Sequence, residues 1–583
     1  MRLPHAAILF MALFFIGIIP SKGQSPGTWS LDKDAEKWVE ATLKTLSQDE
    51  KIGQLLIPVA TGQFTALDSD AFAKVKENIQ KYHVGGYHVF GNELVSGALL
   101  INRMQDLAQV PLLITADFEG GVGYQFRDAT RLPRAMAIGA TGDPNFAYQA
   151  GRVAAEEGRA LGVLVNFYPV VDVNNNPRNP IINIRSFGES VDAVEKMAVA
   201  YIRGTHDGGM MATAKHFPGH GDTSEDTHLM LPTLTIDKDR LQKVELPPFE
   251  AAIHAGVDAV MSAHIYFPAL EPEKGVPATL SKNILTGLLR DELKFSNLVF
   301  TDAMDMHGVT ASFSREEATV RAVQAGVDFV LFTPDVATSF NALKKAVETG
   351  VLDKARIDQS VRRILRAKAA MGLNKSHYTD ITHLDMAIST KPHLKVARDI
   401  AENATTLIKD EKNFLPLQLK PTDRVLVLNV YDSATGWREG KPGGVFVREF
   451  QTRHPGSMVI ELSDLTTLPE FELVRKVLPD FDIVLVNTFA RVAAYRGSIN
   501  LTENETFFLK QLAKMNKPVI TTVFGNPYIP MSVPELPAFV LTFEIYPDAE
   551  VAAVEALTGE IPFRGKLPIS LPGMFELGWG IKK

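Results

Sequence analysis

Imidazoles, carboxylates and a lysine are concentrated in one short segment, residues 215–228. It reads Lys-His-Phe-Pro-Gly-His-Gly-Asp-Thr-Ser-Glu-Asp-Thr-His. Histidines together with carboxylates are ligands that suit zinc. The spacing, however, is not that of a helical His-x-x-x-His pair, and Lys215 would place a competing positive charge beside a cation. The segment therefore favours chemistry without a metal, and nothing in it calls for another cofactor.

An acid/base pair is the other interpretation of this segment. Asp226 and His228 lie two residues apart, so in an extended backbone their side chains point to the same side. A neighbouring carboxylate favours the imidazolium form and raises the pKa of histidine from about 6.5. Such a group can first donate a proton and later accept one. Taken alone, an Asp-x-His sequence is equally typical of an ordinary surface loop.

Apolar runs that alternate with helical periodicity between residues 51 and 334 predict the elements that position these groups. This pattern indicates parallel strands joined by helices, and eight strands indicate a (β/α)₈ barrel of the TIM type. A doubly wound open sheet is the alternative. The predicted strands are Ile52–Ala60, Val84–Phe90, Leu112–Asp117, Phe167–Val173, Met211–His216, Ala259–His264, Leu298–Asp302 and Phe329–Phe332.

Ionisable residues stand where several of these runs stop. In a barrel of this type the carboxyl ends of the strands form the active-site face. Capping of the next helix is the alternative role for any single one of them. They are Asp117, Glu119, Asp172, Lys215, His216, His264 and Asp302.

Several motifs give the chain a specific resemblance. Residues 215–228 resemble the signature of the β-N-acetylglucosaminidase branch of glycoside hydrolase family 3. Asn179-Pro180 with the Arg-Ser-Phe-Gly sequence at 185–188, and Phe-Thr-Asp-Ala-Met at 300–304, resemble two further motifs of that family. The resemblance covers essentially the whole mature chain and implies a barrel followed by a smaller α/β sandwich domain.

The resemblance also implies the roles of individual residues. It makes Asp302 the nucleophile of a retaining glycosidase, His228 the acid/base and Asp226 the partner of His228. A retaining enzyme needs a carboxylate that traps the anomeric carbon and a proton donor for the leaving oxygen. Asp305 competes with Asp302 for the nucleophile's role, but Asp302 stands where the apolar run ends and matches the motif.

Four residues are implied to bind the sugar ring in the subsite for N-acetylglucosamine: Asp117, Arg185, Lys215 and His216. Carboxylates accept hydroxyl protons, and the cations donate charge-assisted hydrogen bonds. Ion pairing that merely holds the strand ends together is the alternative. One departure bears on substrate preference, because the family's Asp-Gln-Glu-Gly-Gly-Arg reads Asp-Phe-Glu-Gly-Gly-Val at 117–122. Val122 replaces the arginine, and Arg127 is close enough in sequence to take its place.

The expected domain boundaries follow from these patterns. We expect a signal peptide at residues 1–23, the catalytic barrel at 24–375, a linker at 376–395 and the C-terminal α/β sandwich domain at 396–583. Predicted strands of the second domain are Arg424–Val430, Asp482–Asn487, Pro518–Phe524 and Ala538–Phe543, and predicted helices are Glu470–Val477 and Glu503–Met515. We expect the second domain to support the barrel rather than to catalyse.

The N-terminus and the overall composition restrict location and partners. Arg2, the apolar run at 6–19 and the small residues near Gly23 are typical of a secretory signal peptide, too short to span a bilayer. We expect cleavage before Gln24 and a periplasmic or secreted protein with no stable membrane insertion. The net charge of -8 and the lack of long basic runs argue against nucleic acid. With no cysteine, thiolate chemistry and disulfides are excluded.

The expected function is thus that of a β-N-acetylhexosaminidase acting on a carbohydrate. A β-glucosidase or β-xylosidase of the same family is one alternative, although those branches generally lack the Asp-x-His pair and tend to have Trp where this chain has Ala303. A non-catalytic exported carbohydrate-binding protein and a metal-dependent hydrolase are others. The sequence does not distinguish muropeptide from chitin-type substrates or hydrolysis from phosphorolysis, and it leaves the oligomeric state open.

Overall fold

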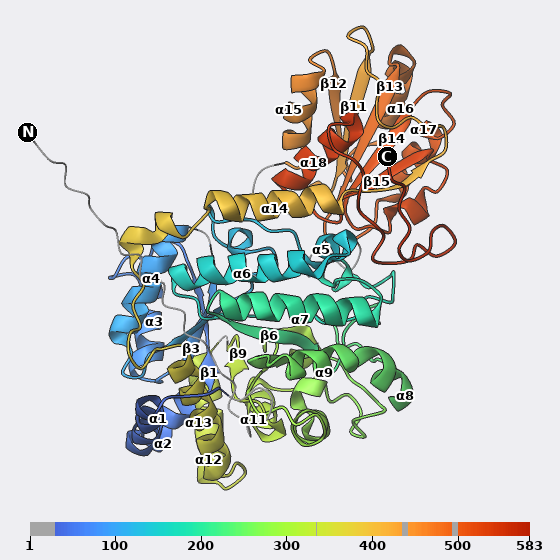
Figure 1. Cartoon of the computed structure of the whole chain (residues 1–583). Helices are drawn as coiled ribbons and strands as arrows, with labels where there is room; N and C mark the ends of the chain where they lie inside the picture. Colours follow the sequence, from blue (N-terminus) through green and yellow to red (C-terminus); the bar gives the residue numbers. More distant parts are fainter. Residues whose placement is uncertain (1–28, 92, 334, 434–440, 493–498) are drawn as a thin grey trace, which may run out of the picture.

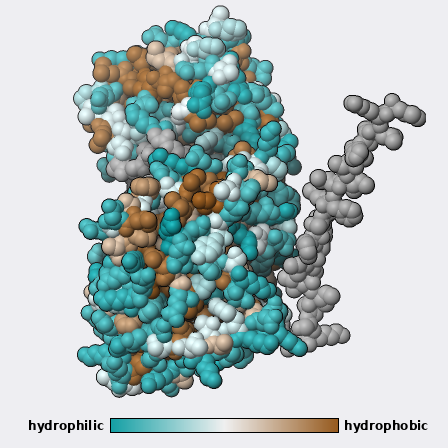
Figure 2. Space-filling view, turned by 90° about the vertical axis from the view of Figure 1, so that its left-hand side faces the viewer, coloured by the Kyte–Doolittle hydropathy of each residue, from teal (hydrophilic) through white to brown (hydrophobic). Residues whose placement is uncertain are grey.

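The computed structural model describes residues 29–91, 93–333, 335–433, 441–492 and 499–583. The predicted signal peptide at residues 1–23 lies outside this range. Figure 1 shows two bodies, a larger one from the N-terminal two thirds of the chain and a smaller one from the C-terminal third. The same two lobes are visible in the space-filling view of Figure 2. In the described part of the chain, no helix combines the length and apolar character needed to cross a membrane.

The strands of the larger body close into a parallel ring, which confirms the predicted barrel. A continuous sheet has the order β2-β3-β4-β5-β6-β7-β8, and β1 pairs with β9 in parallel. The bridge between Phe300 and Phe329 joins β8 to β9, and Pro58 alone separates β1 from β2, so the ring is complete. The strands are β1 (Leu56–Ile57), β2 (Val59–Thr61), β3 (Gly86–Phe90), β4 (Leu113–Ala116), β5 (Val165–Asn166), β6 (Met211–Phe217), β7 (Ala259–Ser262), β8 (Leu298–Phe300) and β9 (Val330–Leu331).

Two of the predicted strands differ from the structure. The strand predicted at Phe167–Val173 is wrong in position. Strand β5 ends at Asn166, and the residues that follow it only run beside β6. Pro169 has no amide hydrogen to offer a ladder, which accounts for the early end of the strand. In the first run, Ile52 belongs to helix α2, whose start is set by the Ser47 and Glu50 capping box.

Helices connect the strands and surround the ring (Figure 1). Gly151 of α6 and Gly204 of α7 let these helices touch backbone to backbone, because a Cβ at Gly204 would lie 1.9 Å from the Tyr148 carbonyl oxygen. The helices of this body are α1 (Lys33–Thr45), α2 (Gln48–Gly53), α3 (Asp70–Gln80), α4 (Leu94–Leu107), α5 (Ala135–Thr141), α6 (Pro144–Leu161), α7 (Val191–Asp207), α8 (Lys238–Arg240), α9 (Pro247–His254), α10 (His307–Thr310), α11 (Arg315–Ala325), α12 (Val336–Glu348) and α13 (Lys354–Ala370).

The smaller body is an α/β domain with helices on both faces of a mixed sheet, as expected for the sandwich domain. Its sheet has the order β10-β15-β14-β13-β11-β12, in which β10 alone runs antiparallel to its described neighbour. Along β11, Leu426 and Leu428 pack into one hydrophobic cluster and Val425 and Val427 into the other. The strands are β10 (Thr406–Asp410), β11 (Val425–Tyr431), β12 (Met458–Ser463), β13 (Ile483–Ala490), β14 (Val519–Gly525) and β15 (Ala538–Leu541), and the helices are α15 (Gly444–Arg453), α16 (Leu468–Val477), α17 (Glu503–Leu512) and α18 (Pro547–Thr558).

The region expected to be a linker, residues 376–395, contains regular structure from Ile381 onward. It contains a short 3₁₀-helix, η6 (Ile381–Met386), and the start of helix α14 (Lys391–Ala404). Helix α14 packs on α5 and α6 of the barrel and on α18 of the second domain. In Figure 1 this helix lies between the two bodies. His393 of α14 also contacts Glu156 and Glu157 of α6 at 3.0 and 2.9 Å.

The two bodies share buried contacts rather than only a connecting segment. Met136 and Ile184 of the barrel belong to the same hydrophobic cluster as the inner face of the second domain. At the edge of this contact Arg134 forms a bidentate pair with Glu544 (Nε to Oε2 2.6 Å, Nη2 to Oε1 3.1 Å), and both side chains are buried. This buried pair joins the barrel to the second domain.

Removing Glu544 tests how much this contact stabilises the protein. Breaking a buried ion pair from one side leaves an unpaired charge and typically costs about 3 to 5 kcal/mol. We therefore expect Glu544→Ala to lower the thermal midpoint clearly in a calorimetric scan. The matched control is Glu472→Ala, because Glu472 pairs with Arg475 on an exposed surface, where such pairs contribute only about 0 to 1 kcal/mol. Equal, small shifts for both variants would show that the two domains do not depend on this pair.

Candidate active site

A cavity of ≈ 290 Å³ lies at the carboxyl ends of the barrel strands, and the residues named from the sequence meet there. Asp226 stands directly behind this wall, bonded to His228. The cavity wall contains every other catalytic or sugar-binding candidate of the sequence analysis: Asp117, Arg185, Lys215, His216, His228 and Asp302. Residues nearly 200 positions apart are thus gathered in one place by the barrel.

The nucleophile candidate stands just after the end of β8. Asp302 is two residues beyond Phe300, and its Oδ1 accepts a hydrogen bond from the Ala303 amide at 2.7 Å. This bond fixes the direction of the carboxylate. Asp305, the alternative nucleophile considered from the sequence, is exposed and does not line the cavity. His264 holds the same turn, because its buried Nε2 donates to the Ala303 carbonyl oxygen at 2.9 Å.

The acid/base candidate lies in the loop that follows β6. His228 Nδ1 is 2.8 Å from Asp226 Oδ1, and the His228 amide donates to the same oxygen at 2.8 Å. Asp226 is 3% exposed, whereas the side chain of His228 is 21% exposed. The carboxylate therefore holds one ring nitrogen from behind while the imidazole contributes to the cavity wall. A hydrogen bond to one ring nitrogen, such as this one from Nδ1 to Asp226, sets both the tautomer and the direction of the imidazole.

Opposite charges alternate along another part of the wall. Lys215 Nζ lies 2.7 Å from Asp117 Oδ1 and 2.8 Å from Glu119 Oε1. Arg185 donates two hydrogen bonds to Glu119, from Nε to Oε2 and from Nη2 to Oε1, each 2.8 Å long. The two cations hold the pKa of Glu119 well below its usual range, even though burial opposes ionisation. This network is the ion pairing considered as an alternative, but it lines the cavity and so presents preoriented donors and acceptors to a polyhydroxylated ligand.

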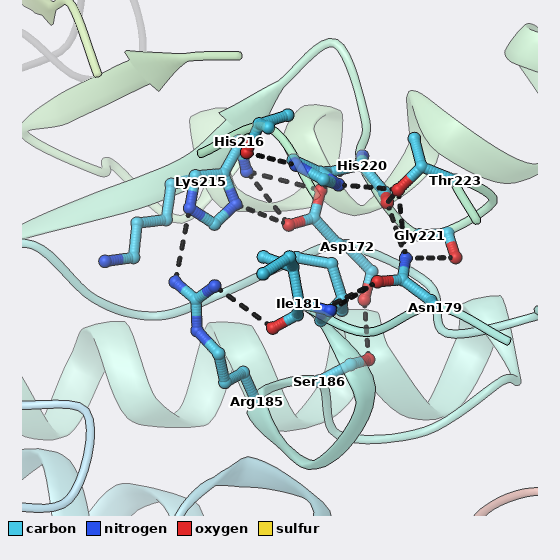
Figure 3. Close-up of polar contacts among 12 residues, drawn as sticks. Asp172, Asn179, Ile181, Arg185, Ser186, Lys215, His216, His220, Gly221 and Thr223 are labelled. Atoms are coloured by element: carbon cyan, nitrogen blue, oxygen red, sulfur yellow. Dashed lines mark hydrogen bonds and ion pairs between the residues drawn. The ribbon is translucent and has the colours of Figure 1, made fainter. Parts of the chain in front are cut away.

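Asp172 organises the backbone on which the histidines stand. Figure 3 shows it below the turn at residues 216–220, where its carboxylate accepts the amides of His216 and His220 at 2.8–3.2 Å and also His216 Nδ1 at 2.7 Å. Arg185 Nη2 lies 3.3 Å from His216 Nε2. Since a guanidinium can only donate, Nε2 is the acceptor and Nδ1 carries the hydrogen. Burial and the nearby cations lower the pKa of His216 well below its ordinary value, so the ring is neutral.

The three imidazoles of residues 215–228 do not converge on a common point. His216 binds Asp172, His228 binds Asp226, and His220 contacts the hydroxyl groups of Thr223 and Thr227. Lys215 forms ion pairs with the carboxylates of Asp117 and Glu119. Within the described ranges, no group of three or more His, Asp or Glu side chains has the arrangement of a metal site. The geometry is that of several separate hydrogen-bonded pairs.

Several wall residues were not assigned by the sequence analysis. Glu119 was noted as a strand-end carboxylate but not as the group that joins Lys215 to Arg185. Val122, which replaces the family's arginine, is fully buried, and Arg127 is exposed and does not line this cavity. Arg134 supplies the further cation instead, from seven residues beyond Arg127. Also unassigned were Tyr124, Gln125 and Val492, the last of which comes from the second domain.

Comparison with known families divides the chain as its fold does. The profile described as "Glycosyl hydrolase family 3 N terminal domain" matches residues 47–367, and that of the family's C-terminal domain matches residues 405–576. Both domains of one family thus follow each other in the expected order.

Individual relatives extend this likeness over nearly the full chain. A "Beta-N-acetylglucosaminidase/beta-glucosidase" of Cellulomonas fimi is 31% identical over 561 residues, which cover 93% of this chain and 97% of the relative. The structure of a β-N-acetylglucosaminidase from Paenibacillus sp. is 33% identical with a TM-score of 0.81, covering 90% of this chain and 99% of that one. A β-glucoside phosphorylase, BglX, superimposes with a TM-score of 0.83 at 28% identity, covering 93% and 98% of the two chains.

Proposed function

The chain belongs to glycoside hydrolase family 3, and from this premise we propose that it is a retaining β-N-acetylhexosaminidase that removes terminal β-linked N-acetylglucosamine from oligosaccharides. The observation that carries the proposal is the cavity itself. Asp302 and the His228 that Asp226 orients line the same space, next to a network of cations and carboxylates. The names of the relatives from Cellulomonas fimi and Paenibacillus support the choice of sugar.

In the proposed reaction Asp302 attacks the anomeric carbon while His228 transfers a proton to the departing oxygen. The product of this step is a glycosyl ester on Asp302. Neutral His228 then removes a proton from water, which attacks the anomeric carbon on the face opposite Asp302. The bond to Asp302 breaks, the carboxylate is released and the product has the β configuration. A neutral base beside Asp302 avoids the repulsion that a second carboxylate would cause. Asp226 stabilises the imidazolium that donates its proton in the first step and forms again in the second.

The network beside this pair is proposed to bind the hydroxyl groups of the sugar. Asp117, Arg185, Lys215 and His216 line the cavity, with Glu119 between the two cations. Because their mutual bonds already fix them, binding costs little additional side-chain entropy. Tyr124 and Arg134 of the barrel also line the cavity, and Val492 makes the second domain part of the site. We therefore propose that this domain supports the reaction without supplying an acid or base.

A panel of aryl β-glycosides, with and without phosphate, tests this proposal. We expect kcat/KM for the N-acetylglucosaminide to exceed that for the glucoside and the xyloside. The comparison with glucosides is needed because one relative's name includes β-glucosidase, and the phosphate arm because BglX is named as a phosphorylase. A preference for the glucoside would contradict the proposed substrate. A sugar phosphate as product would show that phosphate, rather than water, is the acceptor. No turnover of any glycoside would support the non-catalytic alternative.

We also propose that the protein is exported to the periplasm or secreted, with either muropeptides or chitin-type oligosaccharides as natural substrates. The proposal rests on the sequence of residues 1–23. We expect N-terminal sequencing of the protein from its native host to start at Gln24 and fractionation to find it outside the cytoplasm. A chain that retains Met1 in a membrane or cytoplasmic fraction would contradict this.

A further inference from the structure

Asp172 is buried beside the sugar cavity and does not line it, yet its carboxylate contacts two residues that do. Its Oδ2 lies 2.7 Å from His216 Nδ1, and its Oδ1 accepts the His220 amide at 2.8 Å. The His216 amide lies 3.2 Å from both oxygens. The backbone groups around Asp172 are thus donors, and the surroundings suit a carboxylate that only accepts.

The ionised form of Asp172 is what the contact with His216 requires. Burial raises the pKa of Asp172, and the amides of His220 and His216 together with the cations Arg185 and Lys215 oppose this shift. A protonated Asp172 would have to donate its hydrogen to His216 Nδ1, because the two backbone amides cannot accept one. The neutral imidazole would then carry its own hydrogen on Nε2, where it would point at Arg185.

Arg185 uses the acceptor at His216 Nε2 for its orientation. Its Nε and one Nη2 hydrogen are bonded to Glu119 at 2.8 Å, and the other Nη2 hydrogen faces His216 Nε2 at 3.3 Å. Nη1 donates to the Ile181 carbonyl oxygen at 3.2 Å. In the described part of the chain these contacts engage all but one of the N–H bonds of the guanidinium, which leaves one Nη1 hydrogen for a ligand in the cavity that Arg185 lines.

The three side chains form a continuous path from the buried carboxylate to the cavity wall. Figure 3 shows the imidazole of His216 between Asp172 and Arg185, with a dashed line to each. Because an imidazole that donates from one nitrogen accepts at the other, the hydrogen bond at Nδ1 determines what Nε2 can offer. A change at Asp172 is therefore transmitted to Arg185 without any movement of the backbone.

We propose that Asp172 is a positioning residue for the sugar subsite. By holding the hydrogen of His216 on Nδ1, it keeps Nε2 an acceptor for Arg185 and so directs the remaining N–H of Arg185 toward the sugar. The inference rests on the proposed function for the identity of that sugar. Asp172 itself touches neither the sugar nor the reacting atoms.

Asp172→Asn tests this with an amide of the same shape. The carbonyl oxygen of the asparagine can still accept the backbone amides, but its NH₂ group then faces His216 Nδ1 and moves the ring hydrogen to Nε2. Two donors would oppose each other at His216 and Arg185. We expect the dissociation constant of N-acetylglucosamine, measured by calorimetry, to rise roughly ten- to hundredfold, the range for one lost hydrogen bond of a charged group.

The kinetic constants should separate in the same variant. We expect KM of a nitrophenyl N-acetylglucosaminide to rise by the same factor in Asp172→Asn and kcat to change less than about threefold. The reason is that the contact with the sugar is made in the bound substrate as well as in the transition state, so its loss weakens both equally.

The tautomer of His216 is the direct readout, because a merely structural role of Asp172 would not move it. In protein labelled with ¹⁵N-histidine, long-range ¹H–¹⁵N spectra show which ring nitrogen carries the hydrogen, and His216→Gln identifies the signals. We expect the hydrogen on Nδ1 in the wild type and on Nε2 in Asp172→Asn. Arg185→Ala should keep it on Nδ1, since the carboxylate rather than the guanidinium sets the tautomer.

Asp258→Asn is the matched control. Asp258 is also buried and also accepts a histidine and a backbone amide, since its Oδ2 lies 2.7 Å from His206 Nε2 and 2.9 Å from the Ala212 nitrogen. It directly precedes β7, so it stands at the amino end of a strand and outside the wall of the sugar cavity. We expect a lower thermal midpoint for both variants and unchanged sugar binding for Asp258→Asn.

Several results would overturn the proposal. A hydrogen on Nε2 in the wild type would do so by itself, which keeps the proposal testable if Asp172→Asn does not fold. Weaker binding in Asp172→Asn with the hydrogen still on Nδ1, a shifted tautomer with unchanged binding, or an equal loss of binding in Asp258→Asn would do so as well. If the wild type neither binds nor cleaves N-acetylglucosaminides, the proposed function fails, and the tautomers still decide whether Asp172 acts on His216.

Discussion

Asp302→Ala is expected to abolish turnover of every glycoside, activated or not. If Asp302 forms the covalent ester, its removal leaves no group that can stabilise the anomeric carbon from that side. Removing a nucleophile that acts as part of a unit typically costs several orders of magnitude in kcat, and we expect at least a ~10³-fold loss. Steady-state rates with a nitrophenyl N-acetylglucosaminide measure it.

Asp305→Ala is the matched control for this variant. It removes an aspartate only three residues away that is exposed and outside the cavity wall. We expect nearly wild-type rates, and unchanged thermal midpoints for both variants would exclude misfolding. Substantial activity in Asp302→Ala, or an equal loss in Asp305→Ala, would show that the nucleophile is wrongly assigned.

His228→Ala is expected to impair the reaction in proportion to how poor the leaving group is. A nitrophenolate departs with little protonation, whereas a sugar alkoxide needs the proton that His228 supplies. General acid catalysis typically contributes about 10²- to 10⁴-fold, so a loss of that size is expected for chitobiose and a much smaller one for the nitrophenyl glycoside. Plotting log kcat/KM against the pKa of the leaving group should give a steeper slope than for the wild type.

Asp226→Ala should change this slope in the same direction but less. The variant keeps the imidazole and loses only the carboxylate that orients it from 2.8 Å. His254→Ala is a suitable control, because this exposed histidine of α9 contacts the Glu250 carbonyl oxygen of its own helix and lies outside the cavity wall. Uniform small losses across all leaving groups for His228→Ala would contradict its role as the acid.

The local features of the fold could be predicted because the signals lie in consecutive residues. Apolar runs gave strands such as Met211–His216 and Ala259–His264 almost residue for residue, since both faces of a parallel strand are buried and the run is continuous. Edge strand β12 was not predicted, because half-exposed residues such as Met458 break that pattern. Strand β10 was missed as well, and nothing in its local sequence marks its antiparallel pairing with β15.

The site was predictable where one motif contains the interacting residues. Asp226 and His228 are two positions apart, and their contact follows from that spacing. Glu119 was not assigned a role because its importance comes from two residues far away in the sequence, Arg185 at the end of a 3₁₀-helix and Lys215 of β6. Val492 belongs to the site only through the packing of the second domain, which also holds Arg134 through Glu544, and no spacing along the chain reveals such contacts.

Mass spectrometry of a trapped intermediate tests the central claim most directly. A 5-fluoro-N-acetylglucosaminyl fluoride forms the glycosyl ester quickly and hydrolyses it slowly, because fluorine beside the ring oxygen destabilises the oxocarbenium-like transition state while the fluoride leaving group favours the first step. We expect the mass of one sugar to be added to the intact protein and peptide mapping to place it on Asp302. A label on another carboxylate, or turnover with no label at all, would contradict a double displacement through Asp302.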